Sequence, residues 1–233
     1  MNVAAVLFDL DGTLLDHDGA AATAVVASFP DADPAFVARR WAELTEEAVD
    51  RYLAGELTFT EQRRARITAL ARELGLGAWD DARADAWLAG FLRRYEAAWR
   101  AYPDARPAVA ALARRGLRLG VITNGDAVQQ RAKLKAIGLD ARLPYVLTSS
   151  EAGVAKPAAE IFLAACAALR LRPAETAYVG DRLATDARAA VDAGLRGVWL
   201  DRDASGPDVR DEAGVVRITG LDAVVGLVGR ADG

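Results

Sequence analysis

Two aspartates follow a short run of apolar residues near the start of the chain. In the stretch AVLFDLDGTLLD, residues 5–16, Asp9 and Asp11 come directly after the apolar positions 6–8. An apolar run without polar alternation is typical of a strand that is covered on both faces, as in a parallel sheet. Ionised carboxylates beside such a core are costly and repel each other unless a positive charge compensates them. The spacing therefore predicts a metal-assisted site at the carboxyl end of a strand.

Three later apolar segments, LGVIT, YVLTS and AYVG, also lead into polar or glycine-containing stretches. Ligands of an open α/β sheet bind outside the carboxyl ends of its strands. We therefore expect one edge of one sheet to gather the residues that follow these segments: Asp9, Asp11, Thr123, Asn124, Gly125, Lys156, Asp181 and Asp186.

These residue types suit phosphoryl chemistry. A carboxylate such as Asp9 can attack phosphorus and form an aspartyl-phosphate, while Asp11 can protonate the leaving oxygen and later deprotonate water. Thr123 and the amides after it can hold phosphate oxygens at a helix start, and Lys156 adds a point charge. Mg2+ prefers oxygen ligands, which Asp9 and Asp181 can supply. Four aspartates against one lysine leave about three negative charges, so the site needs a divalent ion before a phosphate dianion binds.

Alternating strand and helix patterns position these residues. Apolar strand segments alternate with helical runs from residue 107 onward. The expected strands are 117–123, 145–149, 176–180 and 197–201. The expected helices are 107–115, 127–137, 158–169 and one near 184–193, and a last strand-helix pair is expected near 215–228. This order predicts an α/β fold with a doubly wound parallel sheet and right-handed crossovers.

A helical insert separates the first strand from the rest of its sheet. The stretch from about residue 19 to 99 has apolar residues three and four apart and no strand pattern. The expected domains are residues 1–16 with 100–233 for the sheet and 17–99 for the insert. We expect four tryptophans to fill a small helical core: Trp41, Trp79, Trp87 and Trp99.

Two arginines of the insert, Arg63 and Arg66, are candidates for substrate binding, because guanidinium groups suit carboxylates and phosphates. The alternative is a solvated basic face of a helix.

Composition and charge exclude several classes of partner and of metal site. The chain has 233 residues, a net charge of -4 and no block of like charge, so nothing indicates a nucleic-acid or membrane partner. The apolar runs are too short to span a bilayer and no signal segment is present, so we expect a cytoplasmic location. His17 as the only histidine excludes a two-histidine zinc site, and Cys166 as the only cysteine is read as a core residue.

The motifs together resemble the haloacid dehalogenase-like (HAD) hydrolase superfamily. D-x-D-G-T at 9–13, Thr123-Asn124, Lys156-Pro157 and GDRLATD at 180–186 resemble its four motifs, and the insert resembles its type C1 cap. ITNGDAVQQRAKLKAIGL and AGVAKPAAEIF are similar to the phosphatase branch with pyrimidine 5'-nucleotidases and N-acylneuraminate-9-phosphate phosphatases. The resemblance implies these roles: Asp9 as nucleophile, Asp11 as acid/base, Asp9, the Asp11 carbonyl and Asp181 as metal ligands, and Asp186 as a supporting acid.

The expected function is that of a Mg2+-dependent phosphatase, a monomer or homodimer, acting on a small phosphorylated metabolite through an aspartyl-phosphate. A 2-haloacid dehalogenase shares the fold and nucleophile but needs neither acid/base nor metal, so Asp11 and the acidic fourth motif argue against it. A phosphomutase is a further alternative, because the same aspartyl-phosphate can return its phosphoryl group to a sugar. A phospho-receiver signalling domain is disfavoured by the length, the insert and the acceptor on the first strand. A non-catalytic binding domain is also an alternative, although no catalytic position is missing.

Overall fold

The computed structural model describes residues 1–204, 209–212 and 214–229 of the 233-residue chain. The chain forms two compact units. One contains Met1–Asp16 and Arg100–Gly233, and the other contains His17–Trp99. Among the described residues, no helix is both long and apolar enough to cross a membrane.

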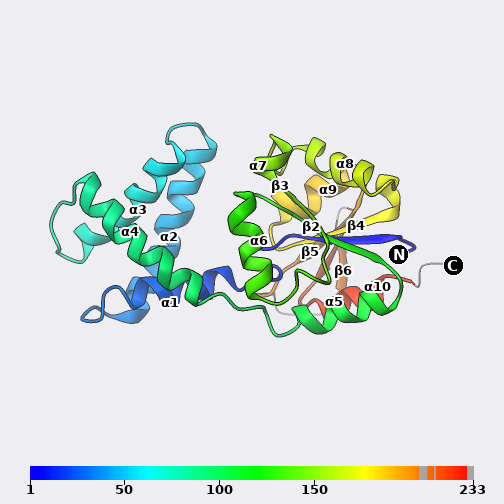
Figure 1. The fold of residues 1–233 in the computed structure, drawn as a ribbon, viewed down its shortest axis with the longest axis horizontal. Coiled ribbons are helices and arrows are strands. Elements are labelled where there is room, and N and C mark those ends of the chain that lie inside the picture. Colours follow the sequence, from blue (N-terminus) through cyan, green and yellow to red (C-terminus); the bar gives the residue numbers. More distant parts are fainter. Residues whose placement is uncertain (205–208, 213, 230–233) are drawn as a thin grey trace. The chain divides into compact units, whose positions relative to one another are not determined.

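The larger unit is built on one seven-stranded sheet with the order β3-β2-β1-β4-β5-β7-β6 (Figure 1). Six strands are parallel: β1 (Ala5–Phe8), β2 (Arg118–Thr123), β3 (Tyr145–Thr148), β4 (Thr176–Gly180), β5 (Arg196–Leu200) and β7 (Val215–Ile218). This confirms the predicted parallel sheet. The strand β6 (Val209–Glu212), which was not predicted, pairs antiparallel with β7 at one edge.

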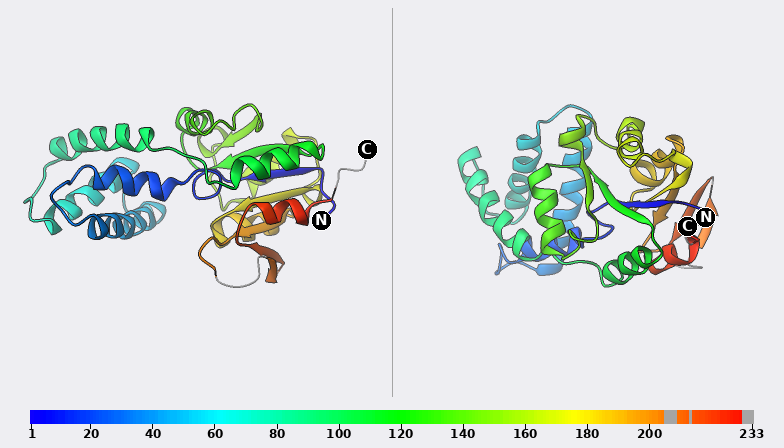
Figure 2. Two further views of the ribbon diagram at one scale, coloured as in Figure 1. Left: turned by 90° about the horizontal axis from the view of Figure 1, so that it is seen from below. Right: turned by 45° about the vertical axis from the view of Figure 1, so that its right-hand side comes forward.

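Strand β1 lies in the middle of the sheet, between β2 and β4 (Figure 2). All four of its residues are fully buried, as an apolar run predicts for a strand covered on both faces. Phe8 pairs in register with Val121 of β2 and Val179 of β4. The next residue, Asp9, therefore stands at the carboxyl ends of three neighbouring strands.

Helices cover both faces of the sheet. Figure 1 shows α8 (Ala159–Ala168) and α9 (Ala189–Asp192) on one side, and α5 (Ala105–Arg114) and α10 (Asp222–Leu227) on the other. The remaining helical segments are α6 (Ala127–Ala136), α7 (Ser149–Ala152), a 3-10 turn (Pro173–Glu175) and a π-helical segment (Leu183–Arg188). Cys166 is buried in the apolar cluster between α8 and the sheet, which confirms its expected core position.

The smaller unit consists of four helices: α1 (His17–Val26), α2 (Pro34–Leu53), α3 (Phe59–Glu73) and α4 (Asp81–Ala97). Local sequence explains where three of them begin. The Asp33 side chain caps α2 ahead of a proline, Thr58 and Glu61 form a capping box on α3, and Asp80 caps α4.

Aromatic residues pack together inside the helical unit. Trp41 is buried, and Trp79, Trp87 and Trp99 are partly buried and pack against the same cluster. The Trp41 and Trp87 rings lie 5.5 Å apart. The predicted tryptophan core is therefore confirmed.

Candidate active site

Lys156 lies at the centre of a buried charge network at the end of β1. Its Nζ donates to Asp9 Oδ1 at 2.6 Å, to Asp186 Oδ1 at 2.6 Å and to the Tyr178 hydroxyl at 2.8 Å. All four side chains are nearly or fully buried. Tyr178 in turn donates to the Ile122 carbonyl, so the network is anchored to β2 and β4 as well as to β1. A buried ion pair of this kind holds its members in one geometry and is costly to break.

Three carboxylates converge beside this lysine. Asp9, Asp181 and Asp186 each offer one oxygen, and these oxygens all lie within 4.8 Å of one another. The Thr13 hydroxyl donates to Asp181 Oδ1 at 3.0 Å, and the Arg182 amide donates to Asp186 Oδ2 at 3.0 Å. Oxygen-only donors in a compact group suit a hard cation such as Mg2+, so the residues present fit the ion that the sequence predicts.

Glycine permits the acidic residues to approach the backbone. A Cβ on Gly12 would lie 2.5 Å from Asp181 Oδ2, and the φ of this residue is 84°. A Cβ on Gly180 would lie 2.4 Å from the Asp186 side chain. Gly12 therefore serves both the turn after β1 and the position of Asp181.

Burial and mutual repulsion raise the pKa values of Asp9 and Asp181. Burial is the largest cause that raises the pKa of Asp9, the nearby Lys156 opposes it, and Asp186 and Asp181 add to it. The pKa of Asp181 is raised by burial and then by Asp186. Burial lowers the pKa of Lys156, but the charges of Asp9 and Asp186 outweigh it and the net shift is upward. A second positive charge in this group would favour the ionised acids.

Asp11 is held by residues that sequence analysis missed. Lys133 Nζ lies 2.8 Å from Asp11 Oδ1 and 2.6 Å from Oδ2, and the Gln130 amide donates to Oδ2 at 3.1 Å. Both partners come from α6 and both are buried. The charge count drawn from the sequence was wrong in this respect, because Lys133 reduces the excess of negative charge from three to two.

Thr123 and Asn124 follow β2 and make different contacts. The buried Thr123 hydroxyl accepts from the Gln130 amide at 2.7 Å. The Asn124 side chain binds the main chain of Lys156 in both directions, accepting from its N–H at 2.8 Å and donating to its carbonyl at 3.0 Å. Asn124 thereby connects the loop after β2 to the loop that carries Lys156.

The amides after Thr123 donate within the protein. The Gly125 N–H donates to the Ser149 hydroxyl at 2.9 Å, and the Ala127 N–H donates to the Ser150 hydroxyl at 3.0 Å. The next two amides of α6 donate to the Asp126 carboxylate at its N-cap. These groups could hold a phosphate, as expected from the sequence, only by exchanging their present acceptors.

Arg63 and Arg66 belong to the helical unit, on α3, where both are partly buried. The Arg66 guanidinium lies 5.2 Å from the Trp41 ring centroid, and that of Arg63 lies 4.2 Å from the Phe59 ring centroid. Among the described residues neither forms an ion pair, whereas Arg64 between them pairs with two aspartates of α4.

Burial lowers the pKa values of both arginines. Burial, followed by the charge of Arg63, lowers the pKa of Arg66 to about 10, and the Arg66 Nε has no hydrogen-bond partner among the described residues. Both arginines are therefore partly shielded from solvent, and a contact with substrate stays a prediction.

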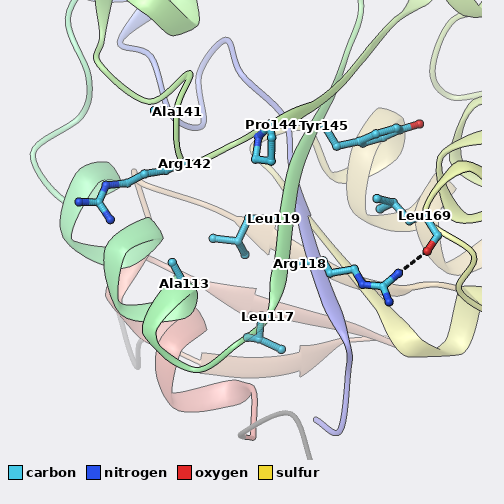
Figure 3. A pocket seen from close by; sticks show the side chains of 9 residues that line it. All are labelled: Ala113, Leu117, Arg118, Leu119, Ala141, Arg142, Pro144, Tyr145 and Leu169. Carbon is cyan, nitrogen blue, oxygen red and sulfur yellow. Dashed lines mark hydrogen bonds between the residues drawn. The ribbon is translucent and has the colours of Figure 1, made fainter. Parts of the chain in front are cut away.

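A cavity of about 540 Å³ lies at the opposite ends of the strands (Figure 3). Its lining includes Leu117 and Arg118 at the start of β2 and Tyr145 at the start of β3. Arg118 points to the Leu169 carbonyl and donates to it. Because the acidic group stands at the strand ends, this cavity is separate from the candidate active site.

Comparisons with known proteins agree on one family of hydrolases. A model of haloacid dehalogenase-like hydrolases matches residues 3–194. The phosphatase MT3486 of Mycobacterium tuberculosis is 32% identical over 231 residues, which cover 97% of this chain and 98% of that protein. The phosphoserine phosphatase of Thermus thermophilus is 44% identical over 101 residues, and this match covers 43% of this chain and only 41% of that protein.

Solved structures share the fold. The magnesium-bound HAD-hydrolase YfnB of Bacillus subtilis has a TM-score of 0.82 and 22% identity, with 97% of this chain and 99% of that chain covered. Structures of dehalogenases share the same fold. The fold is therefore common to enzymes with different reactions, and the choice between those reactions depends on the side chains at the site.

Proposed function

This chain belongs to the haloacid dehalogenase-like hydrolase family, and we propose that it is a Mg2+-dependent phosphatase that acts on a small phosphorylated metabolite. The observation that carries the proposal is the position of Asp9. It stands at the end of the central strand, 2.6 Å from Lys156 and within a group of three carboxylates. The phosphatase relatives support the same reaction class.

Asp9 is the proposed nucleophile. One of its oxygens forms a bond to phosphorus while the bond between phosphorus and the ester oxygen breaks, which gives an aspartyl-phosphate. Asp11 donates a proton to the departing oxygen, so the alcohol leaves as a neutral molecule. Asp11 then takes a proton from water as the water oxygen bonds to phosphorus and the bond between phosphorus and Asp9 breaks. Inorganic phosphate leaves, Asp9 is a carboxylate again, and Asp11 carries the proton for the next cycle.

The surrounding residues prepare Asp9 for this reaction. Lys156 opposes the pKa rise that burial imposes on Asp9, and so favours the ionised form that acts as nucleophile. Thr123 accepts a hydrogen bond from Gln130 and donates only a long bond of 3.5 Å to the Asn124 carbonyl, so its hydroxyl proton can turn to a phosphate oxygen instead. Asp9, the Asp11 carbonyl and Asp181 would hold Mg2+, with Asp186 supporting them. The bound ion would offset the charge of the phosphate dianion.

The remaining proposed substrate contacts come from both units of the chain. In this proposal the phosphoryl group is surrounded by Asn124, Gly125 and Lys156. We also propose that the helical unit, residues 17–99, acts as a cap domain that sets substrate choice. In this proposal Arg63 or Arg66 binds an anionic group of the metabolite, because a partly buried guanidinium without a carboxylate partner favours an anion.

The test is the transfer of phosphate to Asp9. Wild-type protein, Asp9→Asn and Asp11→Asn are compared on nucleoside monophosphates, sugar phosphates and phosphoglycolate with Mg2+, and on 2-haloacids. We expect Asp9→Asn to be inactive and folded. Asp11→Asn should accumulate phospho-enzyme from an ester with a good leaving group, because water activation is impaired. Normal phosphatase activity of Asp9→Asn would contradict the mechanism, and turnover of 2-haloacids alone would contradict the function.

A further inference from the structure

Helix α6 directs two polar side chains toward the protein interior. Gln130 and Lys133 are 1% and 3% exposed, and they share one face of the helix with the buried Leu134 and Ile137. Lys135 on the same helix is exposed. An amine and an amide on a core-facing stripe are unusual, because such groups cost free energy when they are buried unless they have partners.

The partner of Lys133 is Asp11. The lysine Nζ lies within 2.8 Å of both carboxylate oxygens, so a buried cation contacts the whole carboxylate. Gln130 adds a bond to Oδ2 at 3.1 Å. Each additional bond to the carboxylate further restricts its orientation.

Gln130 also connects two candidate functional groups. Its Nε2 donates to the Thr123 hydroxyl at 2.7 Å and to the Asp11 carboxylate at 3.1 Å. An amide nitrogen carries two hydrogens, so it can serve these two acceptors at once, while its contact with the Asn124 carbonyl is longer, at 3.4 Å. Gln130 of α6 thus fixes the Thr123 hydroxyl and the Asp11 carboxylate relative to each other.

We propose that Lys133 and Gln130 are positioning residues for the reaction, and that they hold Asp11 where it can exchange a proton with the ester oxygen and with water. This inference rests on the proposed phosphatase function and on Asp11 as its acid/base. Proton transfer requires a donor within hydrogen-bond reach of the reacting atom, and a misplacement of about 1 Å can cost about 100-fold in rate. The long Lys133 side chain therefore serves to locate Asp11 rather than to bind phosphate.

The experiment compares Lys133→Met with Lys135→Met, which removes an exposed lysine from the same helix. Each is assayed on an alkyl phosphate, whose leaving oxygen needs a proton, and on 4-nitrophenyl phosphate, whose leaving group departs without one. We expect Lys133→Met to lower the rate of phosphoryl transfer from the alkyl ester by about 100-fold. The burst of nitrophenolate should stay near the wild-type rate, and phospho-enzyme should then accumulate. Lys135→Met should resemble wild type on both.

A second background tests whether Lys133 acts through Asp11. In Asp11→Asn protein, adding Lys133→Met should cause no further loss in transfer from the alkyl ester, because the group that it positions is already disabled. Lys133→Arg, which keeps a cation, should restore part of the rate. If Lys133→Met does not fold, as judged by thermal unfolding, Gln130→Met tests the same arrangement and should show the same leaving-group dependence.

Several results would overturn the inference. Equal losses on the two esters, a change confined to KM, or additive losses in the Asp11→Asn background would show that Lys133 binds phosphate or only stabilises the fold. Wild-type rates for Lys133→Met on both esters would show that Lys133 does not position Asp11 for the reaction. A wild-type protein without activity on any phosphate ester would overturn the proposed function and this inference together, so the two failures are distinguishable.

Discussion

Lys156 is expected to stabilise the fold as well as the reaction, and Lys156→Met tests this. The substitution keeps a long side chain but removes the cation that lies 2.6 Å from both Asp9 and Asp186. Removing one partner of a buried pair typically costs about 3–5 kcal/mol, because the remaining charge is buried without compensation. At roughly 2–4 °C per kcal/mol for a chain of this size, the expected loss is about 6–20 °C in Tm.

The loss should depend on pH with a definite sign. Burial raises the pKa of Asp9, and Lys156 opposes this rise. A carboxyl whose pKa is raised in the folded state keeps its proton when the unfolded chain has lost it, so stability falls as the pH rises above the unfolded pKa. Without Lys156 the pKa of Asp9 rises further. The stability difference between wild type and Lys156→Met should therefore be larger at pH 8 than at pH 5.

Calorimetry in the presence of a chelator is the suitable assay. Four of the five tryptophans lie in the helical unit, so fluorescence would report mainly on the unit that lacks Lys156. Lys135→Met is the control, since its lysine is exposed and should cost little. A loss below about 1 kcal/mol, or a difference that shrinks from pH 5 to pH 8, would refute the reasoning that Lys156 compensates buried acids.

Two further predictions concern the metal and the helical unit. A chelator should abolish phosphatase activity and Mg2+ should restore it, while Asp181→Ala should raise the Mg2+ concentration required; full activity in a strong chelator would contradict the metal assignment. Mg2+ at about 100 times its Kd should also stabilise the wild type by about 2.7 kcal/mol in calorimetry. Arg63→Ala and Arg66→Ala should lose activity on the best metabolite by about tenfold or more and retain it on a small generic ester, whereas Arg64→Ala, which removes an arginine paired with aspartates, should affect neither. Equal kinetics of all three variants on both esters would exclude a substrate contact.

The sequence predicted the parallel sheet because its signal is local. The buried runs in β1, β2 and β4 are continuous, and parallel strands that end together must bring the following residues to one edge. Asp9, Lys156 and Asp186 are within hydrogen-bond contact in the structure for that reason. The antiparallel β6 was missed because the stretch VRDE has no apolar alternation to mark it.

The sequence alone could not predict that Gln130 and Lys133 bind Asp11. Motifs at the ends of parallel strands predict which residues lie together at the sheet edge. Which side chains of the following helix face the protein interior depends on the rotation of that helix about its axis. One signal was available, because Gln130 and Lys133 fall on the same helical stripe as Leu134 and Ile137. A polar residue on an apolar stripe has to find a partner, and here the partner is in the preceding motif.

Asp11 and its partners also bear on the choice between a phosphatase and a 2-haloacid dehalogenase. Both reactions use the same fold and an aspartate at the end of the first strand, so Asp9 cannot distinguish them. A halide leaves without a proton, so a dehalogenase does not need a second carboxylate as a proton donor to its leaving group. An alkoxide leaving group needs a proton, and water needs a base. The contacts from Lys133 and Gln130 to Asp11 are therefore more informative about the reaction than the overall fold is.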